Sequence, residues 1–455
     1  MPRTKLDGFG GELLEPGDPG YDDARRLWNV MIDARPALVA RCGSTGDVVA
    51  ALAHARSEGL EVAVRGGGHS ISGLSSTDGG IMIDLQPMNG VEVDPERRRA
   101  RVGGGALLRD LDRATHAHGL ATTGGMVNHT GVGGLTLGGG YGWLARLHGL
   151  ACDNLFSAQV VTARGDIVTA SDDENTDLFW GIRGGGGNFG VVTEFEFRLH
   201  RMGPVLSVER RYAPEDAVAV LRVFRDLLAA APRELCGLAD MAAGRDGGDL
   251  GHSSPETREF IMWLVYVGPD LEEGERLVAP LARAAQPTAE SARVMTYPEV
   301  QSLTSDDSGV RKRHYWKGSL VWDLSDAFLD TFVDRGVLGD GACGLEIFSL
   351  GGAISDVGDD DTAYPSRGAV FDSLAAATWE DPRDDERNIS TTRANWEALR
   401  AFVRGGVYVN DLGADAQDRV REVYGSKFDR LVALKRRWDP DNTFHRNANV
   451  PPTSA

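Results

Sequence analysis

The sequence predicts an α+β protein built from two or three lobes, on three observations. A chain of 455 residues is longer than one ordinary hydrophobic core accommodates. Strand-like runs of alternating apolar residues occur among amphipathic helical segments, which is typical of mixed folds. The 58 glycines include four runs before residue 200, and packing alone does not explain them because glycine weakens helices and strands.

The N-terminal lobe is predicted to open with a helix and three strands. Ser44 or Thr45 is suited to cap the helix, and Gly59 is suited to end it. Alternating apolar residues predict strands at 61–65, 81–85 and 90–94. The first of these strands runs directly into the glycine loop 66–73, so we expect that loop to leave the end of a strand.

The middle of the chain is predicted to form a second lobe of strands and helices. Apolar and aromatic runs indicate strands at 260–266, 319–322 and 345–350. Amphipathic spacing indicates helices at 214–231 and 394–403. We place domain boundaries near 202 and 405.

The glycine loop is suited to hold an anion, because consecutive backbone N–H groups form a nest for a phosphate or pyrophosphate. Several motifs are excluded. The sequence contains no Gly-Lys dipeptide, so it has no P-loop, and the loop leads toward further strands, unlike a Rossmann fingerprint. Gly68-His-Ser70-Ile-Ser72 lacks the final glycine of a nucleophile elbow.

Charge and cysteine content narrow the partners. A formal net charge of -19 disfavours nucleic acids and anionic membranes, which such a surface repels. The four cysteines are scattered without a CxxC pair, which argues against a zinc site or a disulfide framework. No HExxH motif is present, and the acidic stretches 356–361 and 380–386 are expected to be solvated loops, so we predict no metal. No apolar leader or membrane span is found, and the expected location is the cytoplasm.

Ordered motifs carry a resemblance to a known family. The sequence has Arg65-Gly-Gly-Gly-His69-Ser70, the glycine-rich run 131–143, and the run 177–193 with four successive glycines. The tail adds residues 435–442 and 444–452. Together they resemble the FAD-linked oxidases of the vanillyl-alcohol-oxidase superfamily, in the berberine-bridge-enzyme-like branch. The resemblance spans about residues 25–452.

The resemblance implies a PCMH-type FAD-binding domain that is split in sequence, with an α/β substrate lobe carrying a large antiparallel sheet. The divisions it implies are an N-terminal extension, the FAD domain, the substrate domain and a C-terminal return, at 1–33, 34–202, 203–405 and 406–455. It also implies that FAD is bonded to His69 through the flavin 8α-methyl group. Many relatives add a cysteine link, but the matching position here is Val127, so we expect a single link and a merely buried Cys152.

The remaining cofactor contacts are also implied by the resemblance. Thr130 matches the position that flanks the reactive face of the flavin in relatives, so it is expected to shape the oxygen pocket or to be an ordinary loop hydroxyl. The full set of expected FAD contacts is Arg65, Gly66, Gly67, Gly68, His69, Ser70, Thr130, Gly131, Gly133, Gly134, Gly140, Asn154, Gly187, Val192, Asn410 and Asn447.

Polar residues on strand-like runs are the candidates for acid–base work. Oxidation needs a base to take a proton while hydride leaves the substrate. Glu346 lies between Leu345 and Ile347, where partial burial raises a carboxyl pKa. The catalytic candidates are Glu346, Tyr408, Lys317 and Tyr315; each is alternatively a solvated strand residue or a structural hydrogen-bond partner.

These expectations converge on an FAD-dependent oxidase. The implied reaction takes hydride from a small alcohol, amine, sugar or secondary metabolite, and O2 then reoxidises the flavin and yields H2O2. A dehydrogenase with another acceptor, an oxygenase, and a non-catalytic flavin or ligand carrier remain alternatives. The expected partners are the substrate and O2, with no nucleic acid or membrane, and the chain is expected to be a monomer or homodimer.

Overall fold

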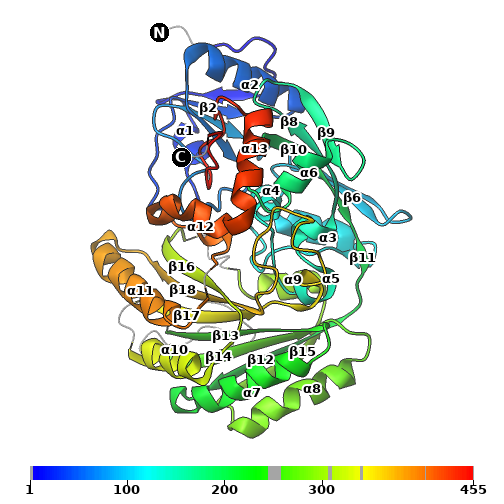
Figure 1. Cartoon of the computed structure of the whole chain (residues 1–455), viewed down its shortest axis with the longest axis vertical. Coiled ribbons are helices and arrows are strands. Elements are labelled where there is room, and N and C mark those ends of the chain that lie inside the picture. The colour runs from blue at the N-terminus through cyan, green and yellow to red at the C-terminus, as the bar shows by residue number, and fades with distance from the viewer. Residues whose placement is uncertain (1–3, 244–257, 306–309, 339–341, 405, 454–455) are drawn as a thin grey trace.

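The computed structural model describes residues 4–243, 258–305, 310–338, 342–404 and 406–453. Within these ranges the chain forms three large sheets and one two-stranded sheet, with helices around them. Figure 1 shows the N-terminal and C-terminal parts together in one half of the molecule and the middle of the chain in the other half. The α+β class and the large antiparallel sheet predicted from the sequence are therefore confirmed. The predicted boundary at 405 lies outside the described residues.

The first sheet has four strands in the order β1-β2-β4-β3 and lies in the half of the molecule that contains the termini. Its strands are β1 Glu12–Leu14, β2 Leu38–Arg41, β3 Val62–Arg65 and β4 Ile81–Asp84. Helix α2 (Thr45–Glu58) packs on it, because its apolar face is buried with the strands. The Ser44 hydroxyl accepts from the Asp47 backbone N–H, and Gly59 ends the helix at φ 66°, as the sequence predicts.

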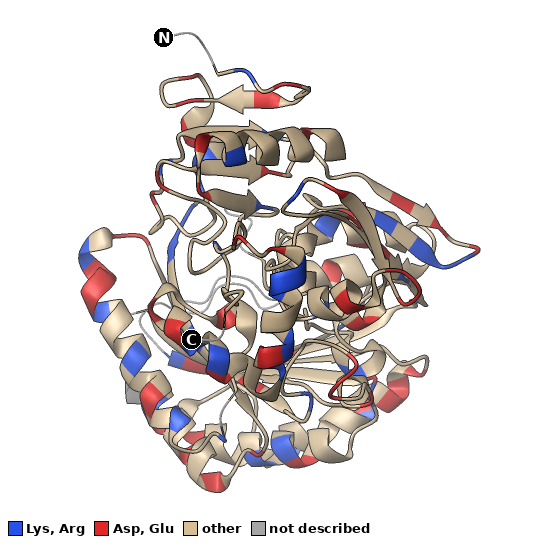
Figure 2. Cartoon of the chain, turned by 45° about the horizontal axis from the view of Figure 1, so that its top comes forward, with Lys and Arg blue, Asp and Glu red and all other residues tan. Residues whose placement is uncertain are grey.

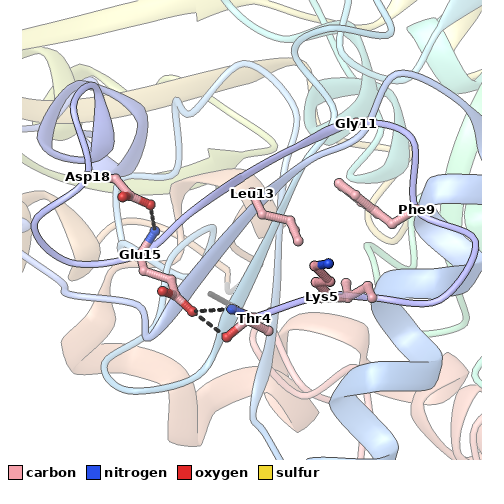
Figure 3. Close-up of a pocket in the computed structure, with 8 residues that line it drawn as sticks. Thr4, Lys5, Phe9, Gly11, Leu13, Glu15 and Asp18 are labelled. Atoms are coloured by element: carbon pink, nitrogen blue, oxygen red, sulfur yellow. Dashed lines mark hydrogen bonds between the residues drawn. The ribbon is translucent and has the colours of Figure 1, made fainter. Parts of the chain in front are cut away.

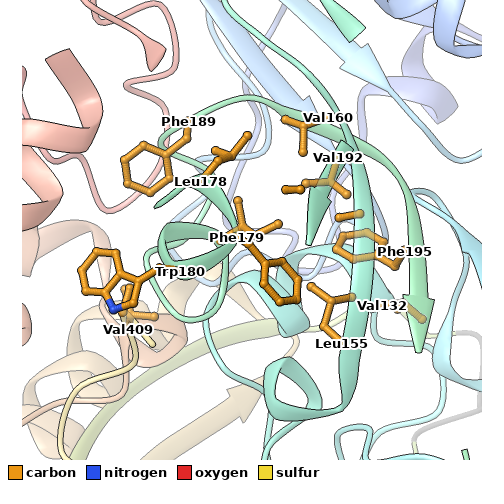
Figure 4. Close-up of a cluster of buried hydrophobic side chains, with 14 of the residues drawn as sticks. Val132, Leu155, Val160, Leu178, Phe179, Trp180, Phe189, Val192, Phe195 and Val409 are labelled. Atoms are coloured by element: carbon orange, nitrogen blue, oxygen red, sulfur yellow. The ribbon is translucent and has the colours of Figure 1, made fainter. Parts of the chain in front are cut away.

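The second sheet has five antiparallel strands in the order β5-β6-β10-β8-β9. They are β5 Val91–Asp94, β6 Arg99–Gly103, β8 Leu155–Val161, β9 Ile167–Ser171 and β10 Val191–Arg198. Helix α6 (Thr176–Ile182) directs Leu178 and Phe179 into the hydrophobic cluster beneath this sheet (Figure 4). The short strands β7 Leu120–Ala121 and β11 His200–Arg201 pair beside it.

The C-terminal segment returns to this half of the molecule. Helices α12 (Val420–Tyr424) and α13 (Phe428–Trp438) lie beside the N-terminal elements (Figure 1). The buried Lys435 ammonium donates to the carbonyl oxygens of Asn188 and Phe444 and lies 2.7 Å from Asp439. One lysine thus ties the C-terminal segment to the four-glycine loop.

The third sheet has seven strands, all antiparallel, in the order β15-β12-β14-β13-β17-β18-β16. Its strands are β12 Val205–Tyr212, β13 Leu235–Ala243, β14 Arg258–Tyr266, β15 Ala289–Met295, β16 Arg313–Val321, β17 Cys343–Ser349 and β18 Phe371–Trp379. One face packs on helices α7 Ala217–Ala230, α8 Leu271–Ala284, α10 Asp326–Leu338 and α11 Asp385–Arg400 (Figure 1). The other face turns toward the half that contains the termini.

The strands and helices predicted for the middle segment are present, but one helix begins earlier than predicted. The strands expected at 260–266, 319–322 and 345–350 lie within β14, β16 and β17 apart from one terminal residue in each of the last two. The helix expected at 394–403 begins earlier, at Asp385 in α11, because Asp381 and Pro382 start a turn that leads directly into it. Its first two turns carry only one apolar residue, Ile389, so apolar spacing does not reveal them.

The remaining helices are short and connect the sheets. They are α1 Tyr21–Arg25, α3 Leu108–His116, α4 Val132–Leu137, α5 Ala145–His148 and α9 Tyr297–Ser302. Acidic and basic residues are interspersed along the helices, as Figure 2 shows for the long helices around the third sheet. Local pairing of this kind keeps a surface of high net negative charge from forming one continuous acidic field.

Candidate active site

The main cavity has a volume of about 420 Å³ and is lined by residues from the N-terminal part, the middle and the C-terminal part of the chain. Its walls come from the loop after β3, from α4 and the loop before it, and from the start of β10. Trp316 of β16 and the C-terminal segments 408–412 and 444–448 complete it. Residues far apart in the sequence therefore share one wall, so the site exists only in the complete fold.

Two glycine segments approach each other closely at the centre of the cavity. A Cβ on Gly67 would lie 2.4 Å from the backbone nitrogen of Gly131, so neither segment tolerates a side chain at the crossing. Gly134 and Gly187 also line the cavity, and a Cβ on either would meet no protein atom within 4 Å. The buried Asn447 Oδ1 has no hydrogen-bond partner among the described residues. Open glycine walls and an unused polar atom fit a large polar ligand such as FAD.

The ring of His69 lies against the rings of Trp28 and His129. Its Nε2 atom lies 2.6 Å from Nδ1 of His129, and its ring stacks on Trp28 with centroids 4.5 Å apart. The opposite face of Trp28 stacks on His314 of β16 at 3.6 Å. Burial, followed by the charges of His129 and His314, holds the pKa of His69 well below its usual value, so its imidazole is neutral at pH 7.

Acidic and aromatic groups gather on the side of the third sheet that turns toward the cavity. The Tyr141 hydroxyl donates to Oδ2 of Asp372 at 2.8 Å, and Asp411 lines the cavity. Burial and the charge of Glu346 raise the pKa of Asp372 to about 7, against a lowering by the Tyr141 hydrogen bond. Burial and the charges of Asp372 and Glu346 raise the pKa of Asp411 well above its usual value.

Tyr408 is held as a neutral phenol beside these acids. Its oxygen accepts from the Gly140 backbone N–H at 3.0 Å and from Nδ2 of Asn410 at 2.6 Å. Burial raises the pKa of Tyr408, and the charge of Asp411 adds to this effect. Because two donors already point at its oxygen, its own O–H is left to donate into the cavity.

Most of the residues predicted to contact the cofactor line the cavity. They are Gly66, Gly67, Gly68, His69, Ser70, Thr130, Gly131, Gly133, Gly134, Gly187, Val192, Asn410 and Asn447. Val127, the position at which relatives carry a second attachment, also lines it.

Arg65 and Gly140 lie behind the lining. The Arg65 guanidinium donates to the carbonyl oxygen of Ala24, and its Nε lies 4.0 Å from Asp84, so it joins two segments of the protein. Gly140 reaches the cavity only through its hydrogen bond to Tyr408.

Asn154 is a structural residue in this fold. Its Nδ2 donates to the carbonyl oxygens of His148 and Leu150 at 2.9 and 2.8 Å, and its Oδ1 lies 2.6 Å from Nε2 of His200. These contacts fix the turn before β8, away from the cavity lining.

Tyr315 and Lys317 face away from the cavity, which corrects their expected position at the reacting centre. Side chains alternate along β16, so Trp316 lines the cavity while Tyr315 and Lys317 lie on the side of α11. The Lys317 ammonium and the Tyr315 hydroxyl both contact Asp415, each at 2.8 Å. Arg393 of α11 completes this cluster.

Other site residues have no signal in the sequence. Trp28 lies in the N-terminal extension, His129 precedes the glycine-rich run, and Asp372 lies in a strand among apolar residues. Their roles arise from contacts between segments far apart in the chain. Only Tyr141 and Asp411 stood beside motifs already singled out, within the run 131–143 and one residue after Asn410.

All four cysteines are free and buried, including Cys152, as predicted, and the cavity lining contains none of them. Among the described residues, no group of three or more metal-ligating side chains is found. Within the same residues, no helix has the length and apolar character needed to cross a membrane.

A smaller cavity of about 330 Å³ lies within the N-terminal segment between Thr4 and Asp18 (Figure 3). Thr4 contacts the Glu15 carboxylate, and the Asp18 carboxylate accepts from the Glu15 backbone N–H at 3.0 Å. These contacts hold the segment against itself. The smaller cavity shares no lining residue with the main cavity.

Comparison with known proteins agrees with this site. Residues 36–171 match the family of FAD binding domains, and residues 407–451 match the family described as berberine and berberine like. The chain is 32% identical to (R)-6-hydroxynicotine oxidase of Paenarthrobacter nicotinovorans over 97% of each chain. It is 32% identical to the FAD-linked oxidoreductase pgmH of Aspergillus terreus, over 94% of this chain and 90% of that one. The crystal structure of 6-hydroxy-D-nicotine oxidase from Arthrobacter nicotinovorans superposes with a TM-score of 0.86 at 30% identity over 98% of each chain.

Proposed function

Because the chain belongs to the berberine-bridge-enzyme-like branch of the vanillyl-alcohol-oxidase superfamily and is an FAD-linked oxidoreductase, we propose that it is an oxidase with covalently attached FAD. It oxidises a small organic substrate and passes the electrons to O2, which yields H2O2. The observation that carries this proposal is one cavity that joins two features. One is the wall lined by glycines, called the cradle, and the other is the buried group formed by Tyr141 with Asp372 and Asp411.

The cradle holds the cofactor through backbone rather than through side chains. Gly66 to Gly68, Gly131 and Gly134 present a wall without Cβ atoms, and Asn447 offers its unused amide oxygen. Bound FAD supplies the acceptor for the substrate's hydride. Thr130 lies on the same wall, where a small hydroxyl leaves space for O2.

The covalent link is proposed at Nδ1 of His69. The Nε2 atom of this ring is engaged by His129, so Nδ1 is the nitrogen left for the bond. His129 Nδ1 is placed to hold the proton that the His69 imidazole gives up when the link forms, since the two atoms are 2.6 Å apart. With Val127 at the position of the second attachment, a single link is expected.

Proton transfer from the substrate is assigned to Tyr141 and Asp372. The phenol oxygen takes the substrate's O–H or N–H proton as it passes its own proton to Oδ2 of Asp372, 2.8 Å away. A carboxyl with a pKa of about 7 is half ionised at neutral pH, which suits a base. Tyr408 donates its O–H toward the reacting group, and Glu346 acts through its charge on Asp372.

Two measurements test the proposal. The purified protein is denatured in acid and run on a gel under ultraviolet light; a fluorescent band whose peptide mass places FAD on His69 is the expected result. The flavin is then reduced anaerobically by a panel of alcohols, amines and sugars and mixed with O2 in a stopped-flow instrument. Rapid reoxidation with stoichiometric H2O2 supports the oxidase, slow reoxidation favours a dehydrogenase, and colour that persists across the panel favours a carrier.

A further inference from the structure

The loop 126–130 forms the cavity wall beside His69. Met126, Val127 and Thr130 line the cavity, and Nδ1 of His129 lies 2.6 Å from Nε2 of His69. The loop contains no helix or strand, so its shape depends on the groups that bind it from outside. The position of His129 is therefore set by the neighbours of this loop.

The N-terminal end of α3 holds one side of the loop. The backbone N–H groups of Leu108 and Arg109 donate to the carbonyl oxygens of Thr130 and Asn128, at 2.9 and 2.7 Å. The first N–H groups of a helix have no partner within the helix, so they are available to a neighbouring loop. The loop is thus anchored to the part of the chain that carries the cradle.

Hydroxyl groups from the end of α9, in the middle of the chain, hold the other side. Helix α9 lies beside α3 (Figure 1). The Thr304 hydroxyl donates to the carbonyl oxygen of Met126 at 2.6 Å. The Ser305 hydroxyl accepts from the Asn128 backbone N–H at 2.9 Å, and the Ser302 hydroxyl accepts from Nδ2 of Asn128 at 3.3 Å. Asn128, the residue before His129, is therefore bound through both its backbone and its side chain.

The two serine hydroxyl groups are oriented as acceptors. Oγ of Ser302 donates to the carbonyl oxygen of Pro298 at 3.0 Å, and Oγ of Ser305 donates to that of Gln301 at 3.1 Å. A serine hydroxyl has one proton and two lone pairs, so these bonds leave its lone pairs for Asn128. The end of α9 thus presents acceptors in fixed directions.

Helix α9 is itself anchored in the core. Tyr297, Val300 and Gln301 are buried, and Nε2 of Gln301 donates to Oδ2 of the buried Asp112 on α3 at 3.2 Å. Residues 302–305, in contrast, lie nearer the surface. Their hydroxyl groups can therefore be removed without opening a cavity in the core.

The ring of His69 is held by a different segment. The Trp28 backbone N–H donates to the carbonyl oxygen of Gly68 at 3.1 Å, and the Trp28 indole stacks on the His69 ring. A change at residues 302–305 should therefore displace His129 relative to His69 rather than move the two rings together.

We propose that Ser302, Thr304 and Ser305 are positioning residues for the attachment of FAD, and that they act through His129. This inference rests on the proposed function, because it concerns how the link at His69 forms. In that step Nδ1 of His69 forms a bond to the 8α carbon of FAD, one C–H bond of that carbon breaks, and the Nε2 proton of His69 passes to His129. The two electrons of the C–H bond and the two released protons reduce O2 to H2O2.

The test measures the rate of attachment separately from flavin binding. Full-length protein from riboflavin-starved cells is mixed with FAD in air. Covalent flavin is followed by in-gel fluorescence after acid denaturation, and total bound flavin is followed by absorbance. We expect Ser305→Ala and Thr304→Val each to slow attachment by about tenfold or more while FAD still binds, since a misplacement of about 1 Å can cost about 10²-fold in rate.

Conservative and control variants separate positioning from loss of structure. Thr304→Ser keeps the hydroxyl group and should restore the rate. Thr331→Val is the matched control, because it removes a similar hydroxyl bond, to the carbonyl oxygen of Ala327, at an exposed site on α10. Thermal melting checks that each variant folds, and Ser302→Ala, at the exposed end of α9, gives an independent measurement if Ser305→Ala does not fold.

A double-mutant cycle with His129→Ala shows whether the effect passes through His129. If it does, Ser305→Ala should slow attachment no further in the His129→Ala background, because coupled residues are not additive. Equal slowing in both backgrounds, or an unchanged rate in Ser305→Ala and Thr304→Val, overturns the inference and leaves the proposed oxidase intact. If the unmodified protein forms no covalent flavin, it is the proposed function that fails.

Discussion

Nε2 of His69 lies 2.6 Å from Nδ1 of His129, so the two imidazole rings are joined by one hydrogen bond at the wall of the cavity. A hydrogen bond between two histidine rings requires one to donate and the other to accept, so the tautomer of one ring sets that of the other. The pair therefore determines which nitrogen of His69 faces the cofactor.

The first prediction concerns this pair. His69→Ala abolishes the covalent link, whereas His129→Ala leaves the attachment nitrogen in place but removes the proton acceptor. We expect the fraction of covalent FAD in freshly purified His129→Ala to fall by about tenfold or more, since a positioned acid–base group contributes about 10²-fold or more to rate. In-gel flavin fluorescence after acid denaturation measures this fraction. His118→Ala, at an exposed histidine, should match the unmodified protein, and full attachment in His129→Ala would remove the assigned role.

The second prediction concerns Trp28, whose indole lies between the rings of His69 and His314. Trp28→Ala removes both stacking contacts and should reduce the free energy of unfolding by about 1–3 kcal/mol, at about 0.5–1.5 kcal/mol for each aromatic pair. Trp28→Phe, which keeps a flat ring, should recover most of that loss. Urea unfolding monitored by circular dichroism gives both values, and equal stability of the two variants would contradict the stacking argument.

The third prediction separates Tyr141 from Tyr408. Tyr141→Phe removes the proton path to Asp372 and should lower the anaerobic rate of flavin reduction by about 10²-fold or more. Tyr408→Phe loses a hydrogen-bond donor but leaves that path intact, so its rate should fall less. Stopped-flow reduction at saturating substrate measures the two rates. A larger loss in Tyr408→Phe would assign the proton transfer to the other phenol.

The fourth prediction concerns pH and stability. The pKa of Asp372 is about 7 in the folded protein, above the value of about 4 for an unfolded aspartate, so the folded state binds its proton more tightly. The free energy of unfolding that depends on this group is therefore lost as pH rises from about 4 to 7.

Asp372→Asn should consequently melt at a higher temperature than the unmodified protein at pH 8, by about 2 °C or more. The difference should shrink as the pH falls toward 4, where the native carboxyl group is protonated in both states. Calorimetry of the cofactor-free proteins over this pH range measures it. A gain in stability that is independent of pH would show that Asp372 is not held near Glu346 and Asp411 as an unneutralised group.

The fifth prediction distinguishes two glycines of the cradle. Gly134→Ala places a methyl group into open cavity space and lies in α4, where alanine is favoured over glycine by about 1 kcal/mol. We expect an apoprotein at least as stable as the original with at least tenfold weaker FAD binding. Gly67→Ala, in contrast, collides with the backbone of Gly131 and should lower both stability and flavin content. Flavin absorbance and thermal melting of both variants check these expectations.

The cradle could be predicted from the sequence because its signals are local. Gly66 to Gly68 directly follow β3, and Gly131 to Gly134 stand at the start of α4. A run of glycines at an element boundary already indicates close approach of backbone to a ligand. The helix cap at Ser44 and the end at Gly59 are local signals of the same kind.

The proposed catalytic group could not be predicted, because its position depends on strand register. A shift of one residue along β16 would exchange Trp316 with Tyr315 or Lys317 at the cavity wall. Asp372 and Asp411 come from a strand and from the C-terminal return, and nothing in either neighbourhood signals the other. Their shared burial appears only when the third sheet and the tail are packed together.

The C-terminal return also sets an order of events in the life of the protein. The wall of the cavity includes residues 62–75 and residues 444–448, so one side of the cradle is missing until the C-terminal segment has been made and has docked. We therefore expect the proposed bond to His69 to form only after residues 444–448 have docked against the N-terminal part of the cavity. Protein that is truncated near its end should accumulate as a colourless species with an unmodified histidine.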